Sequence, residues 1–313
     1  MPVPSLPTEL LDQVLSLAIR KHDRPIDILL AHSTFYAIGL RELHQYLSFC
    51  TVKRLQRFSK QPPKLSYHPR AIDIQLAGGV HEPDLILLIR DILVSRCRFQ
   101  SARRLLREEA DDTTISTSVR HLNLCFNSHN GDPNISKLRD VFSVVNPQTF
   151  CWTGPDPGHH FSNAIIPTAA LYLLQAASHW TNLQELTLTH ISFLAFSPLR
   201  GSTVTRIAAP EPPFTALPLL DLHTITLGQV IFLAPWLVVR ILESQPSLKK
   251  LRLVDAYRES IWGRRIRQAD IEATVEDEFE DDDGWLLARA KEVVSCESQT
   301  ERIVGGDRMD GEK

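Results

Sequence analysis

A six-residue pattern of apolar residues recurs along the chain and constrains its fold more than any other feature. Positions one, four and six are apolar, and the last two alternate with polar residues, as in a strand with one buried face. Clear copies lie at 119–124, 183–188, 222–227 and 248–253, and looser copies lie at 71–76 and 147–152. Helical patterns precede several copies, and dipeptides such as Asn146-Pro147 and Thr181-Asn182 separate helix from strand.

Repeated helix–strand units predict an α/β fold, namely an irregular leucine-rich-repeat-like solenoid with a parallel sheet. The copies are unevenly spaced, which indicates a degenerate array with insertions. An ordinary α/β domain whose strands happen to carry leucine remains the alternative.

The first 46 residues predict a separate helical unit. Leu10, Leu11 and Val14 share one face of a helix that Pro7 can begin, and Pro25 ends that pattern before a second one. Two or three short helices in about 40 residues offer little shared interior, so we expect their apolar faces to need a neighbour or a partner.

The charge distribution divides the rest of the chain. Net charge is -3 overall, but acidic residues outnumber basic ones in 255–313, whereas the remainder is basic. We therefore predict three parts: a helical unit at 1–46, a repeat domain at 47–254 and an acidic, partly disordered extension at 255–313. Within that extension we expect Glu276–Asp283 to stay unfolded, helix and strand patterns from Trp285 onward, and a frayed end from Gly305.

Composition argues against several classes of protein. With 313 residues, 43% hydrophobic, and no signal-peptide pattern, the chain predicts a globular protein of the cytoplasm or nucleus. The apolar stretches 164–177 and 230–242 are too short to span a bilayer, so no membrane association is expected. The odd number of cysteines, 5, argues against a disulfide framework. A basic cluster between Arg96 and Arg107 is interpreted as the solvated face of a helix, with no nucleic-acid partner.

No known catalytic or metal-binding motif is present. The sequence lacks GxSxG, GxxxxGK[ST], GxGxxG and HExxH, and the pair His159-His160 has no ligand partner at a suitable offset. The acidic run does not place carboxylates at the positions that a calcium-binding loop needs. We expect no catalytic residue, no metal and no cofactor. A hydrolase whose Ser, His and Asp meet only on folding stays open as a third hypothesis.

Residues 6–15, LPTELLDQVL, resemble the opening of an F-box, whose usual form is LPxELLxxIL. Residues 27–36, DILLAHSTFY, are similar to its second helix, with Phe35 or Tyr36 where a tryptophan is usual. The leucine patterns downstream resemble the irregular repeats of fungal F-box/leucine-rich-repeat proteins.

The resemblance implies a non-catalytic substrate receptor of an SCF-type ubiquitin ligase. Its partners would be a Skp-type adaptor, the cullin–RING ligase and an unknown protein substrate. The residues that match the adaptor contacts of the family are Pro7, Leu10, Leu11, Val14, Ile28, Leu29 and Phe35. Each of these could instead be a core residue packed against the first repeat.

Strand alternation predicts which residues face outward from the repeats and contact a substrate. These residues are Asn123, Glu185, Thr187, Thr226, Lys250 and Arg252. The alternative function is a repeat-based interaction scaffold without ligase association, in which the F-box-like segment is an N-terminal cap.

Overall fold

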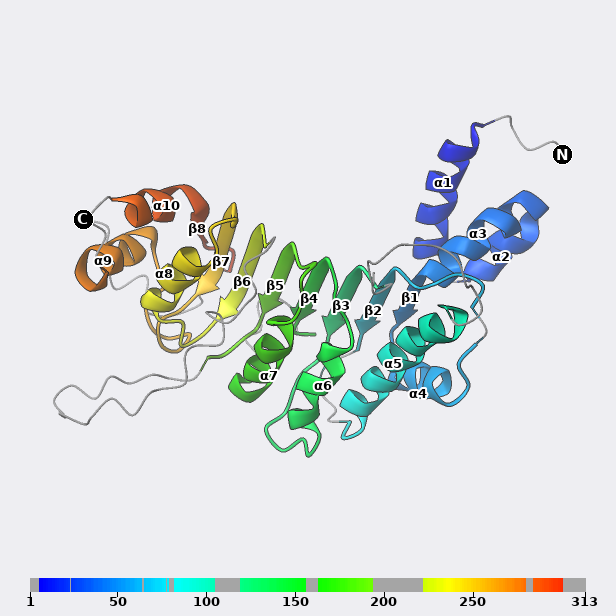
Figure 1. The fold of residues 1–313 in the computed structure, drawn as a ribbon, viewed down its shortest axis with the longest axis horizontal. Helices are drawn as coiled ribbons and strands as arrows, with labels where there is room; N and C mark the ends of the chain where they lie inside the picture. Colours follow the sequence, from blue (N-terminus) through cyan, green and yellow to red (C-terminus); the bar gives the residue numbers. More distant parts are fainter. Residues whose placement is uncertain are drawn as a thin grey trace.

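The computed structural model of the chain contains a sheet of eight parallel strands that follow one another in chain order (Figure 1). The structure describes residues 6–22, 24–63, 65–76, 78, 82–104, 119–155, 163–193, 222–279 and 284–300. Within 95–104 it describes the backbone only. The predicted α/β class with a parallel sheet is confirmed within this part of the chain.

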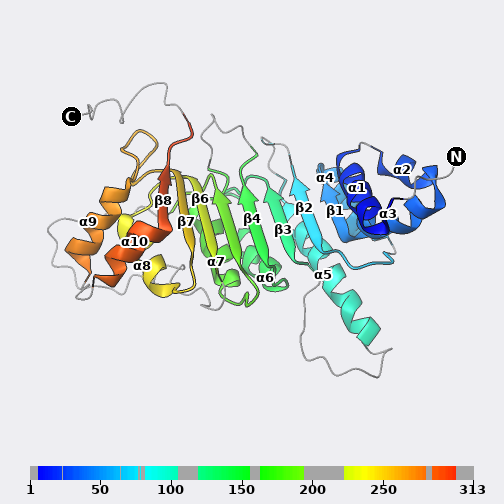
Figure 2. The same cartoon turned by 90° about the horizontal axis from the view of Figure 1, so that it is seen from above.

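The eight strands are short. They are β1 (Tyr46–Phe49), β2 (Ala71–Gln75), β3 (His121–Cys125), β4 (Thr149–Thr153), β5 (Glu185–Thr189), β6 (Thr224–Val230), β7 (Lys250–Ala256) and β8 (Val294–Glu297). Between them run α4 (Val52–Lys60), α5 (Leu85–Arg104), η1 (Ile135–Lys137), α6 (Leu138–Ser143), α7 (Pro167–Ala177), α8 (Pro235–Ser244), α9 (Gln268–Glu278) and α10 (Trp285–Val293). Helices α4 to α8 lie along one face of the sheet, and no helix of the described residues covers the central strands on the other face (Figures 1 and 2).

The repeated apolar positions form the main core beneath the sheet. Leu122 and Leu124 of β3 are in register with Phe150 and Trp152 of β4, and all four are at most 1% exposed. The same positions in β5, β6 and β7 are leucine or isoleucine and are also buried. Apolar helix faces cover these rows, so each strand–helix unit buries its interior only by stacking on the next unit.

Two strands lie outside the predicted repeats, and one predicted copy of the six-residue pattern begins at a different residue in the structure. Register pairs Ile72 and Ile74 with Leu122 and Leu124, so the pattern in β2 begins at the buried Pro69 rather than at Ala71. Strands β1 and β8 extend the sheet at its two ends, although their sequences contain too few leucines to match the six-residue pattern.

The predicted boundary at residue 254 is wrong. Strand β7 continues to Ala256, and β8 pairs with β7 from Leu251↔Val294 to Val254↔Glu297. Helices α9 and α10 bury Ile271, Val275 and Leu286 in the same core. The segment therefore adds one more unit to the sheet despite its acidic composition, because its apolar residues are spaced to face inward. Glu276 to Glu278 belong to α9, while 280–283 and 305–313 lie outside the described residues.

At the other end, the N-terminal helices form their own small core. These helices are α1 (Thr8–Lys21), α2 (Pro25–Ala31) and α3 (Ser33–Gln45). Leu15, Ile19 and their buried neighbours pack together, separately from the main core, so our expectation that this unit could not bury its own faces is only partly right. Gly39 of α3 makes the close packing possible, because a Cβ there would lie 2.7 Å from Ile19 Cδ1.

Candidate functional site

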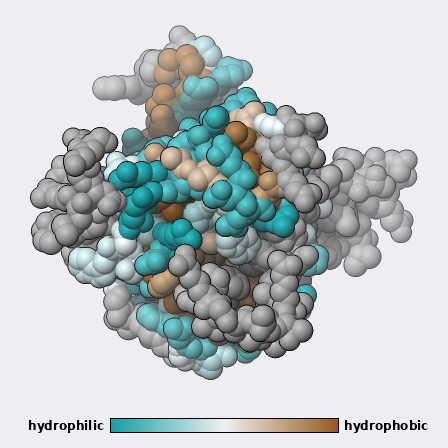
Figure 3. Space-filling view, turned by 90° about the vertical axis from the view of Figure 1, so that its left-hand side faces the viewer, coloured by the Kyte–Doolittle hydropathy of each residue, from teal (hydrophilic) through white to brown (hydrophobic). Residues whose placement is uncertain are grey.

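An apolar stripe runs along the solvent side of α1. Leu6, Leu10, Val14 and Leu17 are 46%, 48%, 55% and 59% exposed, and they recur at the spacing of one helix face. Ile26 and Leu30 of α2 are exposed as well. We call these six residues the α1–α2 stripe. Figure 3 shows hydrophobic residues on one side of the helical unit, which projects above the rest of the molecule in that view.

The seven predicted adaptor-contact residues fall into three groups: exposed, buried and half-buried. Pro7, Leu10 and Val14 lie on the exposed side of α1. Leu11 and Leu29 are 7% and 1% exposed and belong to the small core, which corrects their assignment as surface contacts. They point inward because they lie on the face of each helix that meets the other two helices.

The remaining two residues, Ile28 and Phe35, are half-buried against the same small core. The core therefore lies between the three helices and not, as the alternative had it, against the first repeat. Leu6, Leu17, Ile26 and Leu30 were missed, although the helical spacing around Leu10 could have revealed Leu6 and Leu17.

The open face of the sheet carries the six predicted substrate-contact residues. Asn123, Thr187, Thr226 and Arg252 form one row across the strands together with Asp73 and Cys151. Glu185 and Lys250 lie in the adjacent row. All six predicted residues are half-buried or exposed, whereas the leucines between them are buried.

The charged side chains near both ends of this row already have hydrogen-bonding partners. Asp73 is only 5% exposed, and its carboxylate accepts hydrogen bonds from Tyr46 Oη, Gln75 Nε2 and Asn123 Nδ2 at 2.8 to 2.9 Å. Near β8, the guanidinium of Arg252 donates two hydrogen bonds to Glu297, at 2.8 and 2.6 Å. Hydrogen bonding to Arg252 holds the pKa of Glu297 below its ordinary value.

Between these pairs the open face is nearly uncharged. Strands β4 to β6 present six threonines here, and Glu185 is the ionised side chain among the positions that face outward on these strands. The threonines are Thr149, Thr153, Thr187, Thr189, Thr224 and Thr226. Burial raises the pKa of the Cys151 thiol in the same region to about 11, so this thiol is protonated near neutral pH and is a poor nucleophile.

The described residues hold one serine–histidine contact that bears on the hydrolase hypothesis. Ser178 Oγ lies 3.2 Å from His179 Nδ1 in the turn that ends α7. Both groups also lie within hydrogen-bond distance of the Gln175 carbonyl, at 2.8 and 3.2 Å. A catalytic base is oriented by a third group, usually a carboxylate, and here that position belongs to a helix-ending carbonyl. The contact is therefore a helix-capping arrangement.

The described part of the chain holds neither a cluster of metal ligands nor a membrane-spanning helix. No group of three or more His, Cys, Asp or Glu residues there could hold a metal ion. None of the helices described is both long enough and apolar enough to cross a bilayer. The predicted His159-His160 pair and the arginines from Arg96 to Arg107 lie outside the described side chains.

Comparison with known proteins gives no assignment. No protein-family model matches the chain, and no curated protein matches it.

The sequence-based reading missed two polar residues that the structure brings together, Tyr46 and Asp73. Asp73 sits between Ile72 and Ile74, so the strand pattern alone could have placed it on the open face beside Asn123. The sequence did not reveal the position of Tyr46, because β1 follows α3 directly and no turn residues mark where the strand begins.

Proposed function

We propose that this protein is a non-catalytic substrate receptor of an SCF-type ubiquitin ligase. In this proposal α1–α3 form an F-box-like unit that docks a Skp-type adaptor. The eight-stranded array is an irregular leucine-rich-repeat-like solenoid whose open face binds a protein substrate. Ligation chemistry would reside in partner enzymes, so the receptor needs no nucleophile of its own.

The observation that carries the proposal is the α1–α2 stripe. Leu10 and Val14 are about half exposed even though the same helix buries Leu11 and Leu15. A helix that is apolar on both its inner and its outer side leaves a surface that water solvates poorly, and such surfaces are typical of interaction sites. An amphipathic helix presented in this way fits the groove of a partner.

The alternative is a scaffold in which α1–α3 only cap the end of the repeats. A cap covers the end of the core with its apolar side and turns a polar side to solvent. In this chain the buried residues of the helical unit form a cluster separate from the main core, and the stripe faces solvent. These two features favour docking over capping.

Binding of a purified Skp-type adaptor to the full chain tests the proposal. We expect Leu10→Asp combined with Val14→Asp to weaken binding at least about tenfold, because two charges would be buried in an apolar interface. Both side chains are exposed, so the variant should fold. Leu11→Asp is unsuitable because Leu11 is buried.

The matched control is Tyr67→Asp combined with Trp262→Asp, which places two charges on exposed apolar residues outside α1–α3. This control should bind the adaptor like the unaltered chain. Absence of adaptor binding by the unaltered chain, or equal binding by the Leu10/Val14 variant, would contradict the receptor proposal and leave the scaffold.

A further inference from the structure

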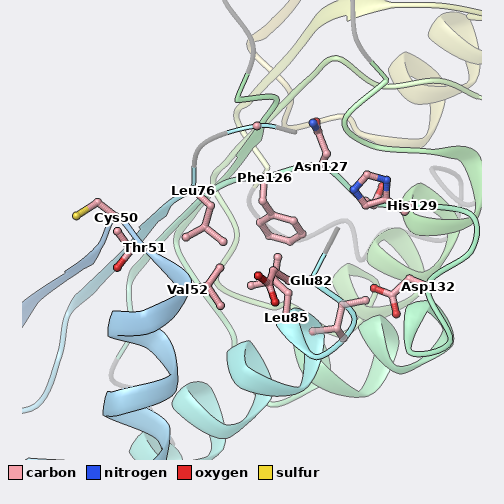
Figure 4. Close-up of a pocket in the computed structure, with 13 residues that line it drawn as sticks. Cys50, Thr51, Val52, Leu76, Glu82, Leu85, Phe126, Asn127, His129 and Asp132 are labelled. Atoms are coloured by element: carbon pink, nitrogen blue, oxygen red, sulfur yellow. The ribbon is translucent and has the colours of Figure 1, made fainter. Parts of the chain in front are cut away.

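A pocket of about 210 Å³ lies beyond the carboxyl ends of β1, β2 and β3 (Figure 4). Thr51 follows β1, Leu76 follows β2 and Phe126 follows β3, and each lines the pocket. In α/β folds the carboxyl edge of a parallel sheet is the usual place for ligands, because the loops there can vary without disturbing the strands. The pocket is separate from the α1–α2 stripe.

The walls of the pocket are largely apolar, but carboxylates line it. Val52, Leu85 and Phe126 supply apolar surface. Glu82 is half-buried, and its carboxylate forms no hydrogen bond or ion pair with the described residues. Figure 4 shows Glu82 and Phe126 near the centre of the view and Asp132 toward the right, all lining the pocket. Asp132 is 7% exposed, and its Oδ1 accepts a hydrogen bond from the Asn134 backbone at 2.7 Å.

An anion is a poor fit although two helices begin at this pocket. The positive end of a helix dipole acts through the free N–H groups of the first turn. In α4 the N–H of Arg54 already donates to the Thr51 carbonyl at 3.1 Å and to its Oγ1 at 3.3 Å. In α5 the N–H of Leu85 donates to the Glu82 carbonyl at 3.0 Å. The carboxylate of Glu82 lines the same pocket and would repel an anion there, so the site favours a cation.

We propose that this pocket binds the side chain of a lysine or arginine from the protein substrate. A long basic side chain places its methylenes on apolar walls and its charged end against a carboxylate, here Glu82. The volume is below the roughly 300–1,000 Å³ of pockets for drug-sized ligands and suits one side chain. The identity of the partner as a substrate rests on the proposed function, whereas the preference for a cation does not.

The test uses the full chain, labelled with ¹³C at the methyl groups of Ile, Leu and Val, and NMR titration. The probe is the peptide acetyl-Gly-Ser-Arg-Ser-Gly-amide. Its control contains citrulline, which has nearly the same shape as arginine but no charge. We expect the arginine peptide to shift the methyl signals of Val52, Leu85 and Ile86 saturably, and the citrulline peptide to bind at least about tenfold more weakly.

A charge-neutral variant assigns the effect to the pocket. Glu82→Gln should weaken binding of the arginine peptide about tenfold, because it removes the carboxylate and keeps the size of the side chain. Glu276→Gln, which makes the same change on an exposed residue of α9 outside the proposed binding surfaces, should leave the affinity unaltered. Correct folding of both variants is checked from the methyl spectrum.

Three outcomes would overturn the proposal: no saturable shift at the pocket methyls, equal binding of the citrulline peptide, or unaltered binding by Glu82→Gln. Failure of the proposed function is read separately, from adaptor binding through the α1–α2 stripe. Glu82→Gln should bind the adaptor normally, so the two assays fail independently.

Discussion

The phenolic hydroxyl of Tyr46 lies 2.9 Å from a carboxylate oxygen of Asp73, where the helical unit meets the sheet. Tyr46 follows the last residue of α3, and the guanidinium of Arg20 in α1 lies 5.2 Å from the centre of its ring. Arg20 also pairs with Glu42 of α3 at 3.2 Å. One tyrosine therefore contacts the helical unit through its ring and the second strand through its hydroxyl.

Tyr46→Phe should destabilise the protein by about 1–3 kcal/mol, because it leaves the buried carboxylate of Asp73 with fewer donors. Urea denaturation measures the change in the free energy of unfolding. Tyr36→Phe is the matched control, since Tyr36 is 47% exposed and forms no hydrogen bond with the described residues. A loss below about 0.5 kcal/mol for Tyr46→Phe, similar to that of a neutral surface substitution, would contradict the expectation.

The same pair predicts a dependence of stability on alkaline pH. Burial, and next the hydrogen bond to Asp73, raises the pKa of Tyr46 from its ordinary value of 10.0 to about 12. Because the folded state holds this proton more tightly, its contribution to stability is complete below pH 10.0 and is lost as pH rises toward about 12. The difference in unfolding free energy between the unaltered chain and Tyr46→Phe should therefore be smaller at about pH 11 than at about pH 9. A difference that stays constant or grows would show that the phenol of Tyr46 is not protected.

Gly39→Ala should destabilise the helical unit by about 1–3 kcal/mol, because its new Cβ would overlap Leu29 and Ile19. Alanine favours helix, so a purely local effect would have the opposite sign. The control is Gly131→Ala, where a Cβ meets nothing within 4 Å. Hydrogen exchange of α1–α3 against the sheet locates the loss. Unchanged protection of α1–α3 in Gly39→Ala would refute the close-packing argument.

Asp255→Asn should loosen the end of the sheet beside β8. The Asp255 carboxylate is 2% exposed, pairs with Arg265 at 3.0 Å, and accepts hydrogen bonds from the backbone of Gln299 and Thr300. Asparagine tolerates the left-handed backbone of this residue, φ 51°, so the variant adds no backbone strain; it removes the charge and replaces one accepting oxygen with an NH2 group.

We expect that substitution to cost about 3 kcal/mol, the lower end of the range for a buried pair, since it leaves the half-buried Arg265 without its counter-charge. Thermal unfolding measures the loss, and Asp277→Asn on the exposed side of α9 is the neutral control. Equal melting temperatures for the two variants would mean that the ion pair does not hold this end together.

Sequence reasoning located the central strands from the alternation of apolar and polar residues, which is typical of a strand with one buried face. Leu186 and Leu188 of β5 and the equivalent residues of β6 and β7 are buried, as that alternation predicts. Sequence reasoning also predicted the helix and strand patterns after Trp285, but it placed them in a separate acidic extension because net charge masked the inward spacing of Val294 and Cys296. The net charge of a segment is set by its solvent-exposed side chains, whereas its place in the sheet depends on the alternate apolar residues that face the core.

The candidate site shows a similar division. The residues facing outward on the sheet followed from alternation, since Thr187 and Thr226 must oppose the leucines beside them. In the helical unit, by contrast, Leu10 and Leu11 look equivalent in the sequence but differ in exposure, 48% against 7%. Their difference depends on where α2 and α3 pack against α1, and no local pattern encodes that direction.

Because each described strand of the sheet pairs only with the strands adjacent to it along the chain, no strand pairing within the described residues joins the two ends of the sheet. Pulled from its termini, such an architecture should peel away unit by unit, with each step giving up only the contacts of one strand and its helix.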